Sequence, residues 1–251
     1  MSSDTDLYSP SPTKPAAASA FQPTARSKVK RLPDRGAYDR ESVYAILDTA
    51  FIAHIAYVID GQPYVTPTSF WREGDQLYWH GSSASRMLRA QSAGLPVCFT
   101  VTHVDGLVVA RSGFHSSINY RSVMAFGTAR RIEDIAAKTA ALDAFVERLF
   151  PGRTGEIRRP NVQEIKAASV LGMTIEEAAA KVRQGPPKDD EEDYAAPCWA
   201  GVLPFVTRLA APQPDPRLPA GRAVTPDLAA YETGRMLDEV LGQLAPVRPD
   251  R

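Results

Sequence analysis

Three runs rich in β-branched and aromatic residues follow one another between residues 51 and 80, and they restrict the possible fold more than any other feature. The runs are FIAHIAYVI, PYVTPTSFW and QLYWH, and only DGQ and REGD separate them. β-Branched and aromatic residues favour strands, and such short connections with glycine join neighbouring strands as hairpins. The sequence therefore predicts an antiparallel three-stranded meander.

Further strand-like segments follow the meander. LPVCFTVTHV and GLVVAR predict a second hairpin that turns at Asp105 and Gly106. YRSVMAFGTARRIE predicts a long strand, in which Gly127 marks a bulge or a close approach of another backbone. CWAGVLPFVTRL predicts the last strand, whereas the residue propensities in VLGMTIEEAAAKVR favour a helix through its second half.

Helices are predicted at the joints between these strands. Asp39 is placed to cap a helix in YDRESVYAILDTA, and a short helix is expected over residues 82–93. DIAAKTAALDAFVERLF and PNVQEIKAAS also have helical spacing. Many antiparallel strands with short helices between them predict a mainly β fold with flanking helices, closed as a small barrel.

The chain is predicted to contain one folded domain with an extension at each end. Residues 1–30 hold few large apolar groups, and such a segment cannot bury enough surface to offset the entropy of ordering it, so we expect a disordered tail. Residues 31–210 form the expected domain, interrupted by the charged loop GPPKDDEEDY. Residues 211–251 are a Pro-rich extension, in which LAAYETGRMLDEVLGQL predicts one amphipathic helix.

Composition and missing motifs exclude several classes of function. Lys plus Arg and Asp plus Glu both number 29, so no basic surface for nucleic acid is indicated. The chain has no apolar run near the roughly 18 residues that span a bilayer and no signal-peptide pattern, so we expect a cytoplasmic protein that does not bind membranes. The GxSxG, HExxH, GxGxxG and Walker patterns are absent. Cys98 and Cys198 fit neither a CxxC motif nor a zinc site, so we expect two buried thiols in a reducing compartment and no metal site.

The segment WHGSSASRML joins a predicted strand directly to a predicted helix. Free backbone N–H groups at the start of a helix and serine hydroxyls together favour an anion, and the planar fork of Arg86 suits phosphate oxygens. The alternative is that Ser82 or Ser83 simply caps the helix while Arg86 is solvated. A phosphate-binding corner and a capped helix both remain open at this point.

The four histidines have different expected environments. His54 lies within an apolar strand, which predicts a core or barrel-lining residue. His103 at a hairpin end and His115 in SGFHSSINY are expected at the surface. His80 ends a strand at the candidate anion site, where an imidazole could donate to a ligand or move a proton, although a structural histidine is an equal alternative.

Five segments, in this order, resemble one known family. They are RGAYDRESVYAILD, DGQPYVTPTSFW, LYWHGSSASRML, PVCFTVTHVDGLVVARSGFHSSINYRSVMAFGTAR and WAGVLPF. Together they resemble the flavin-nucleotide-binding proteins of the pyridoxamine 5'-phosphate oxidase superfamily, in particular the nitroimidazole-resistance type, over residues 33–207. The resemblance implies an FMN-binding split β-barrel of six antiparallel strands, a homodimer with FMN in two clefts at the subunit interface, and strands within VLGMTIEEAAAKVR.

The resemblance also implies roles for individual residues. Ser82, Ser85 and Arg86 match the region that contacts the FMN phosphate, and His80 matches the position that reaches the flavin and its substrate, where it would be catalytic. The other positions match elements along the flavin ring or near the dimer cleft: Pro67, Thr68, Tyr120, Arg121, Ser122, Lys181 and Trp199.

The expected function is that of an FMN-dependent oxidoreductase, which takes a hydride from NAD(P)H and reduces a small organic acceptor. A flavin-storage or redox-sensing protein is the first alternative, and a split barrel that binds haem or a deazaflavin is the second. The sequence lacks the arginine-rich motif for pyridoxal phosphate, so oxidation of vitamin B6 is not expected. Its two extensions have no counterpart in the short bacterial members.

Overall fold

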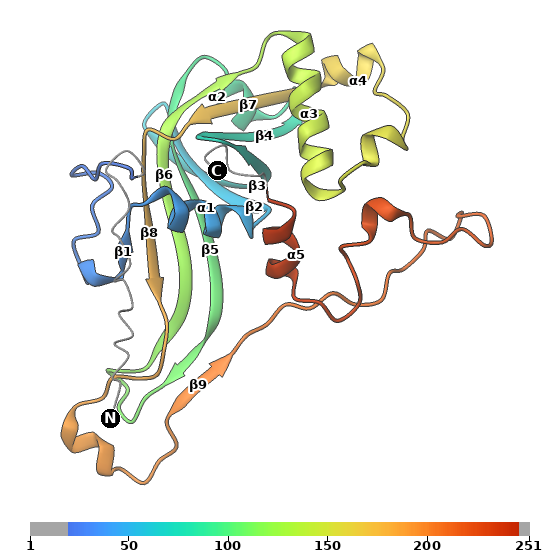
Figure 1. The fold of residues 1–251 in the computed structure, drawn as a ribbon. Coiled ribbons are helices and arrows are strands. Elements are labelled where there is room, and N and C mark those ends of the chain that lie inside the picture. The colour runs from blue at the N-terminus through green and yellow to red at the C-terminus, as the bar shows by residue number, and fades with distance from the viewer. Residues whose placement is uncertain (1–19, 246–251) are drawn as a thin grey trace, which may run out of the picture.

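The computed structural model describes residues 20–245, and its centre is an antiparallel split barrel (Figure 1). Six strands close a ring in the order β2, β3, β4, β7, β6 and β5, as the resemblance implied. Three more strands extend it, because β8 pairs with β6, β1 with β8 and β9 with β5. The strands are β1 (Gly36–Ala37), β2 (Ile52–Ile59), β3 (Gln62–Glu73), β4 (Gln76–Ser82), β5 (Leu95–Val109), β6 (Ser117–Arg131), β7 (Ala168–Thr174), β8 (Glu177–Arg183) and β9 (Gly201–Pro204).

The predicted meander is confirmed. β2 pairs with β3 from Ile52 and Ser69 to Ile59 and Gln62, and β3 pairs with β4 between residues 70 and 79. Asp60 and Gly61 join the first pair with φ angles of 51° and 79°. Positive φ at both central residues is the requirement of the type I′ turn that matches the twist of a hairpin, and glycine meets it without steric cost.

The predicted hairpin at Asp105 and Gly106 is wrong. β5 continues through both residues with a register shift between Val104 and Gly106, and the chain turns only after Val109. A β-carbon on Gly106 would lie 2.7 Å from the carbonyl oxygen of Leu203, so the glycine admits β9 instead of forming a turn. The final strand is also shorter than predicted, because only Gly201–Pro204 pair with β5.

The close approach predicted at Gly127 is confirmed. A β-carbon there would lie 2.3 Å from the carbonyl oxygen of Thr174, at the end of β7. The strands implied for VLGMTIEEAAAKVR are also present, as most of β7 and all of β8. Ala178, Ala179 and Ala180 are buried in β8, so tertiary packing overrides the helical propensity of this segment.

Three predicted helices begin at capping side chains. Asp39 accepts a hydrogen bond from the backbone N–H of Ser42, Asp134 accepts one from Ala137, and Asn161 forms a capping box with Glu164. The single C-terminal helix predicted from LAAYETGRMLDEVLGQL is wrong, because its first part folds back through a turn at Gly234 and bonds to Leu209. The helices are α1 (Arg40–Asp48), α2 (Arg86–Gln91), α3 (Ile135–Leu149), α4 (Val162–Ala167) and α5 (Leu237–Gln243).

Two apolar clusters stabilise this arrangement. The larger one fills the barrel, where Trp79 and Phe99 are fully buried and α1 closes one side with Val43 and Leu47. The smaller one lies between β3, β7 and α3. The segment after β9 runs back to α5, which packs beside α1 (Figure 1).

The structure also bears on two expectations from the composition, one for the cysteines and one for membrane-spanning segments. Cys198 is exposed and Cys98 is only partly buried, so the prediction of two buried thiols is wrong. No helix within residues 20–245 is long and apolar enough to cross a membrane.

Candidate functional site

β3 has an open edge where the barrel splits. Along its length it pairs with β2 from Gln62 to Ser69, but it pairs with β4 only from Phe70 to Glu73. On the β4 side, the backbone of residues 62–69 therefore has no strand partner in the described chain. Unpaired N–H and C=O groups of an edge strand are available to a ligand or to another chain.

The strand–helix corner that the sequence singled out lies on the strand that diverges from this edge. β4 ends at Ser82, Ser85 occupies the N-cap position of α2, and Arg86 is its first residue. The Ser82 Oγ accepts from the backbone N–H of Ala84, while the Ser85 side chain makes no capping bond. The guanidinium of Arg86 lies 4.5 Å from the ring centre of Tyr64 on β3, so it links the corner to the open edge.

A second group of predicted residues lies on the outer face of the sheet β3–β2–β5–β6–β8. On this face the register aligns Pro67 with His54 and Ser122 with Lys181. Tyr120 is on the same face, two residues before Ser122. Thr68 points to the other side of β3, so the structure separates it from Pro67.

The prediction that His54 lies in the core or lines the barrel is wrong. Ala53, Ile55 and Tyr57 fill the barrel, and strand alternation turns His54 outwards. Much of this outer face is apolar and exposed in the part of the chain that the structure describes. Its exposed apolar residues include Ile52, Val58, Val65, Val104 and Met124, and Val65 is 63% exposed.

His80 lies away from both groups. Trp79 points into the barrel, whereas His80 points towards α3, where its ring centre is 4.8 Å from that of Phe145 and 5.9 Å from that of Trp71. The Nδ1 of His80 is buried with no hydrogen-bond partner in the described chain. Burial lowers the pKa of this imidazole, because the charged form loses its hydration.

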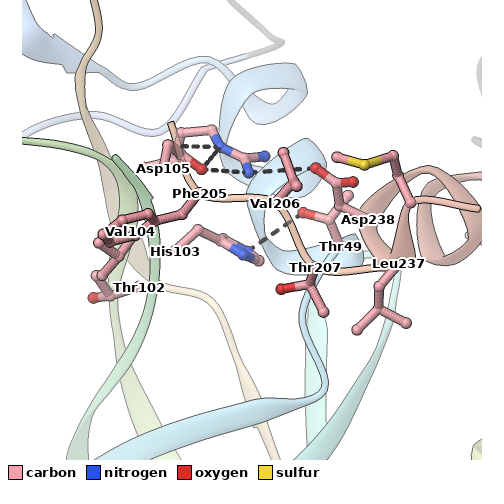
Figure 2. Close-up of a pocket in the computed structure, with 12 residues that line it drawn as sticks. Thr49, Thr102, His103, Val104, Asp105, Phe205, Val206, Thr207, Leu237 and Asp238 are labelled. Atoms are coloured by element: carbon pink, nitrogen blue, oxygen red, sulfur yellow. Dashed lines mark hydrogen bonds and ion pairs between the residues drawn. The ribbon is translucent and has the colours of Figure 1, made fainter. Parts of the chain in front are cut away.

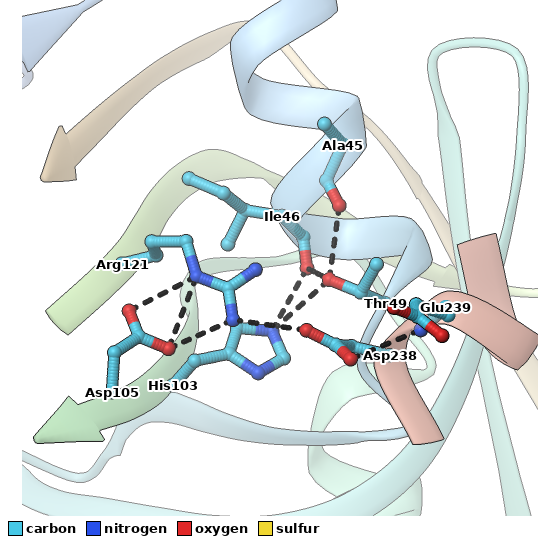
Figure 3. A network of polar contacts seen from close by, with 8 residues as sticks. All are labelled: Ala45, Ile46, Thr49, His103, Asp105, Arg121, Asp238 and Glu239. Atoms are coloured by element: carbon cyan, nitrogen blue, oxygen red, sulfur yellow. Dashed lines mark hydrogen bonds and ion pairs between the residues drawn. The ribbon is translucent and has the colours of Figure 1, made fainter. Parts of the chain in front are cut away.

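Arg121 borders a cavity of about 260 Å³ between the barrel and the C-terminal segment (Figure 2). Its Nη2 is 2.8 Å from Asp105 Oδ1 and 3.5 Å from Asp238 Oδ2 (Figure 3). These partners, mainly the hydrogen bond to Asp105, raise the pKa of Arg121. The cavity is lined by Thr49, Thr102, His103, Val104, Asp105, Arg121, Phe205, Val206, Thr207, Met236, Leu237 and Asp238.

His103 lines this cavity instead of ending a hairpin. Its Nε2 is 3.2 Å from the carbonyl oxygen of Ile46 and 3.4 Å from Thr49 Oγ1 (Figure 3). A carbonyl can only accept, so a bond to it requires the proton on Nε2. No pattern in the sequence indicates this group, because Asp238 and His103 are 135 positions apart and belong to different predicted units.

The remaining predicted residues are apart from these groups. Trp199 is 62% exposed, in the segment that precedes β9. His115 lies in the turn between β5 and β6, as expected near the surface, and its Nε2 is 3.3 Å from Asp190 Oδ2. Residues 20–245 contain no group of three or more His, Cys, Asp or Glu side chains that could hold a metal ion.

Known proteins are similar to this chain in sequence and fold. The model of the pyridoxamine 5'-phosphate oxidase family matches residues 39–182, which is more than half of the chain. The flavocytochrome Anf3 from Azotobacter vinelandii is 45% identical, with a TM-score of 0.79 over 84% of this chain and 98% of that one. The FAD and haem binding protein from Mycobacterium smegmatis is 41% identical, with a TM-score of 0.77 over 81% of this chain and 98% of that one.

A more distant structural neighbour is a putative 5-nitroimidazole antibiotic resistance protein from Bacteroides thetaiotaomicron. It is 23% identical, with a TM-score of 0.48 over 59% of this chain and 86% of that one. No curated protein sequence matches the chain. The family model and the two similar structures agree with the split barrel, and the chain belongs to the pyridoxamine 5'-phosphate oxidase family.

Proposed function

We propose that this protein binds a flavin at the split of the barrel and acts in electron transfer. The flavin ring would lie along the open edge of β3, and its phosphate would bind at the Ser82–Arg86 corner. The observation that carries this proposal is Arg86, a cation that faces the open edge and has no carboxylate partner among the described residues. Two relatives that are more than 40% identical bear the names of a flavocytochrome and an FAD and haem binding protein.

The donors present in the chain fit a flavin. The five N–H donors of Arg86 suit the oxygens of a phosphate, and the Ser85 hydroxyl is not used as a cap. On one edge, the backbone of residues 62–69 pairs with no strand of the described chain, and the polar rim of a flavin ring could bond to it there. When bound, the flavin would supply the redox chemistry, while the protein binds it, orients it and limits access of water.

The identity of the flavin is a finer question. The compact corner suits one terminal phosphate and favours FMN, whereas one relative is named for FAD. We propose FMN and test it by comparing the affinities for FMN, FAD and riboflavin. Riboflavin affinity equal to that for FMN would contradict a phosphate site at Arg86.

A homodimer forms part of the proposal. The outer face that bears Pro67, Ser122 and Lys181 also exposes Val65, Val104 and other apolar side chains. Large exposed apolar areas on a sheet are typical of protein interfaces. A second copy that covers this face would place residues of both subunits around each flavin.

We further propose NAD(P)H as the electron source and a small organic molecule as the acceptor. Storage of flavin or redox sensing without turnover is the alternative. NADH and NADPH oxidation by the purified protein, with and without acceptors, distinguishes the two. Flavin bands without any turnover would favour storage or sensing.

Haem is a second candidate ligand, because both similar relatives are haem or cytochrome proteins by name. Imidazole is a common ligand of haem iron. His80 is packed against Phe145 of α3, and His115 is close to Asp190. The remaining imidazoles are those of His54 on the outer face and His103 beside the cavity, and we propose these two as the candidates. An absorbance spectrum of the purified protein tests both cofactors at once, since flavin bands and a Soret band are distinct.

A further inference from the structure

Arg86 differs from every other arginine that stacks on an aromatic ring in the described part of the chain. Its guanidinium lies 4.5 Å from the ring centre of Tyr64, and it forms no hydrogen bond or ion pair with residues 20–245. Its donors therefore remain available to an anion that is not part of the chain. The other stacked arginines all form an ion pair with an Asp or Glu as well: Arg26, Arg40, Arg72 and Arg111.

The ring beneath Arg86 is itself anchored to the core. Tyr64 stacks on Tyr57 with ring centres 5.6 Å apart and an interplanar angle of 17°. Tyr57 is only 4% exposed, and its hydroxyl lies 3.1 Å from Thr66 Oγ1. The three groups form a stack that begins in the barrel core at Tyr57 and ends at the exposed guanidinium of Arg86.

This stack restricts a side chain that would otherwise be mobile. An exposed arginine has many rotamers, and a ligand that binds it must order it at a cost in entropy. An aromatic ring attracts the guanidinium over its face and leaves the N–H groups at the edge of the plane free. Tyr64 therefore keeps Arg86 beside the open edge of β3 before any ligand arrives.

We propose that Tyr64 is a positioning residue for the flavin phosphate, which acts by holding Arg86 in place. This inference rests on the flavin site proposed above and adds to it a determinant of specificity. Tyr64 itself does not contact the phosphate in this arrangement. It favours phosphorylated flavins over riboflavin because only the phosphate uses Arg86.

The test compares two substitutions in the full-length protein after its flavin has been removed. Tyr64→Leu removes the ring, whereas Tyr64→Phe keeps it. Titration with FMN, FAD and riboflavin, followed by flavin fluorescence, gives three affinities for each variant. We expect Tyr64→Leu to weaken FMN binding roughly three- to tenfold, with riboflavin binding within about twofold of wild type, and Tyr64→Phe to retain the wild-type preference.

A double-mutant cycle with Arg86→Ala isolates the coupling. In the Arg86→Ala background, Tyr64→Leu should leave the ratio of FMN to riboflavin affinity unchanged, because the group that it positions is gone. Tyr194→Leu is the matched control, since Tyr194 is the ring beneath Arg111, whose charge is already paired with Asp189. This control should bind all three flavins as wild type does.

Two results would overturn the inference while the flavin site stands. One is a Tyr64→Leu protein that loses affinity for FMN and riboflavin equally, which would indicate a general packing role. The other is a selective loss of FMN affinity on Tyr64→Leu that persists in the Arg86→Ala background. A wild-type protein that binds none of the three flavins would instead overturn the proposed function, and this inference with it.

Discussion

Arg72 and Asp48 form a buried ion pair that joins β3 to the end of α1. Arg72 Nε is 2.9 Å from Asp48 Oδ1, and Arg72 Nη2 is 2.6 Å from Asp48 Oδ2. The guanidinium also lies 3.9 Å from the ring centre of Tyr44 on α1. The pair fixes α1 over the end of β3 away from the open edge, so it supports the site without touching it.

The first prediction concerns this pair. Asp48→Ala leaves the guanidinium of Arg72 buried without its counter-ion, and loss of one partner of a buried pair costs about 3–5 kcal/mol of unfolding free energy. Urea unfolding of the variant should show this loss. Glu133→Ala is the control, because it removes an exposed ion pair with Arg131, and its unfolding midpoint should stay close to that of wild type.

The second prediction concerns Arg86 itself. Arg86→Ala removes a charge-assisted contact worth on the order of 1.5–3 kcal/mol, which corresponds to roughly ten- to hundredfold weaker FMN binding. Riboflavin binding should hardly change. Arg89→Ala is the comparison on the same helix, because Arg89 is exposed but stacks on no described ring. If Arg86→Ala binds FMN as tightly as wild type, the corner is only the start of a helix.

The third prediction follows from the buried His80. Its pKa is lowered in the folded protein, so the unfolded chain takes up a proton first as the pH falls below the ordinary histidine pKa of about 6.5. The stability contributed by neutral His80 is therefore present above that pH and is lost as the pH falls through the lower pKa of the folded state. His80→Leu should reduce the fall in melting temperature between about pH 7 and pH 5.

The same variant tests the catalytic role that the family resemblance implies for His80. If the imidazole serves the acceptor, turnover per bound flavin or its pH dependence should change in His80→Leu. If His80 only packs against Phe145, turnover per bound flavin stays as in wild type, while acid stability changes. FMN affinity should stay near wild type in both cases, because the ring lies on the α3 side of β4.

Local signals in the sequence were sufficient for much of the fold. Short turns with Asp60–Gly61 and capping residues such as Asp39 act within a few positions, so the meander and the main helices were predicted correctly. Gly106 was misread as a turn residue because the contact that requires a glycine there is distant in the sequence. The glycine makes room for β9, almost a hundred positions later. The same limit applies to β8, whose alanines fit a helix locally but are buried in a strand that pairs with β6.

The candidate site could be predicted only in part for the same reason. The sequence offers Ser82, Ser85 and Arg86 as candidates because serines and an arginine at a strand–helix joint are visible in one short segment. It could not show that Arg86 has no carboxylate partner among residues 20–245, since that depends on every segment that packs nearby. Arg121 is the opposite case: it does have a carboxylate partner, but the sequence could not show this, because Asp238 lies 117 positions away.

The last prediction concerns the outer face of the sheet. Met124 lies near its centre, 46% exposed, and pairs across the sheet with Thr100 and Ala179. If a second copy covers this face, Met124→Arg places a charge without a partner in an apolar interface and should shift the protein from dimer to monomer. Light scattering after size-exclusion chromatography measures the mass directly.

Val162→Arg is the control for that experiment. Val162 is 63% exposed but begins α4, away from the outer face, so the same new charge there should leave the dimer intact. Flavin content gives an independent readout, because sites completed by two subunits should release their flavin when the dimer dissociates. A Met124→Arg protein that remains a dimer would mean that the subunits meet elsewhere. A Met124→Arg monomer that keeps all of its flavin would instead show that one barrel forms the whole site.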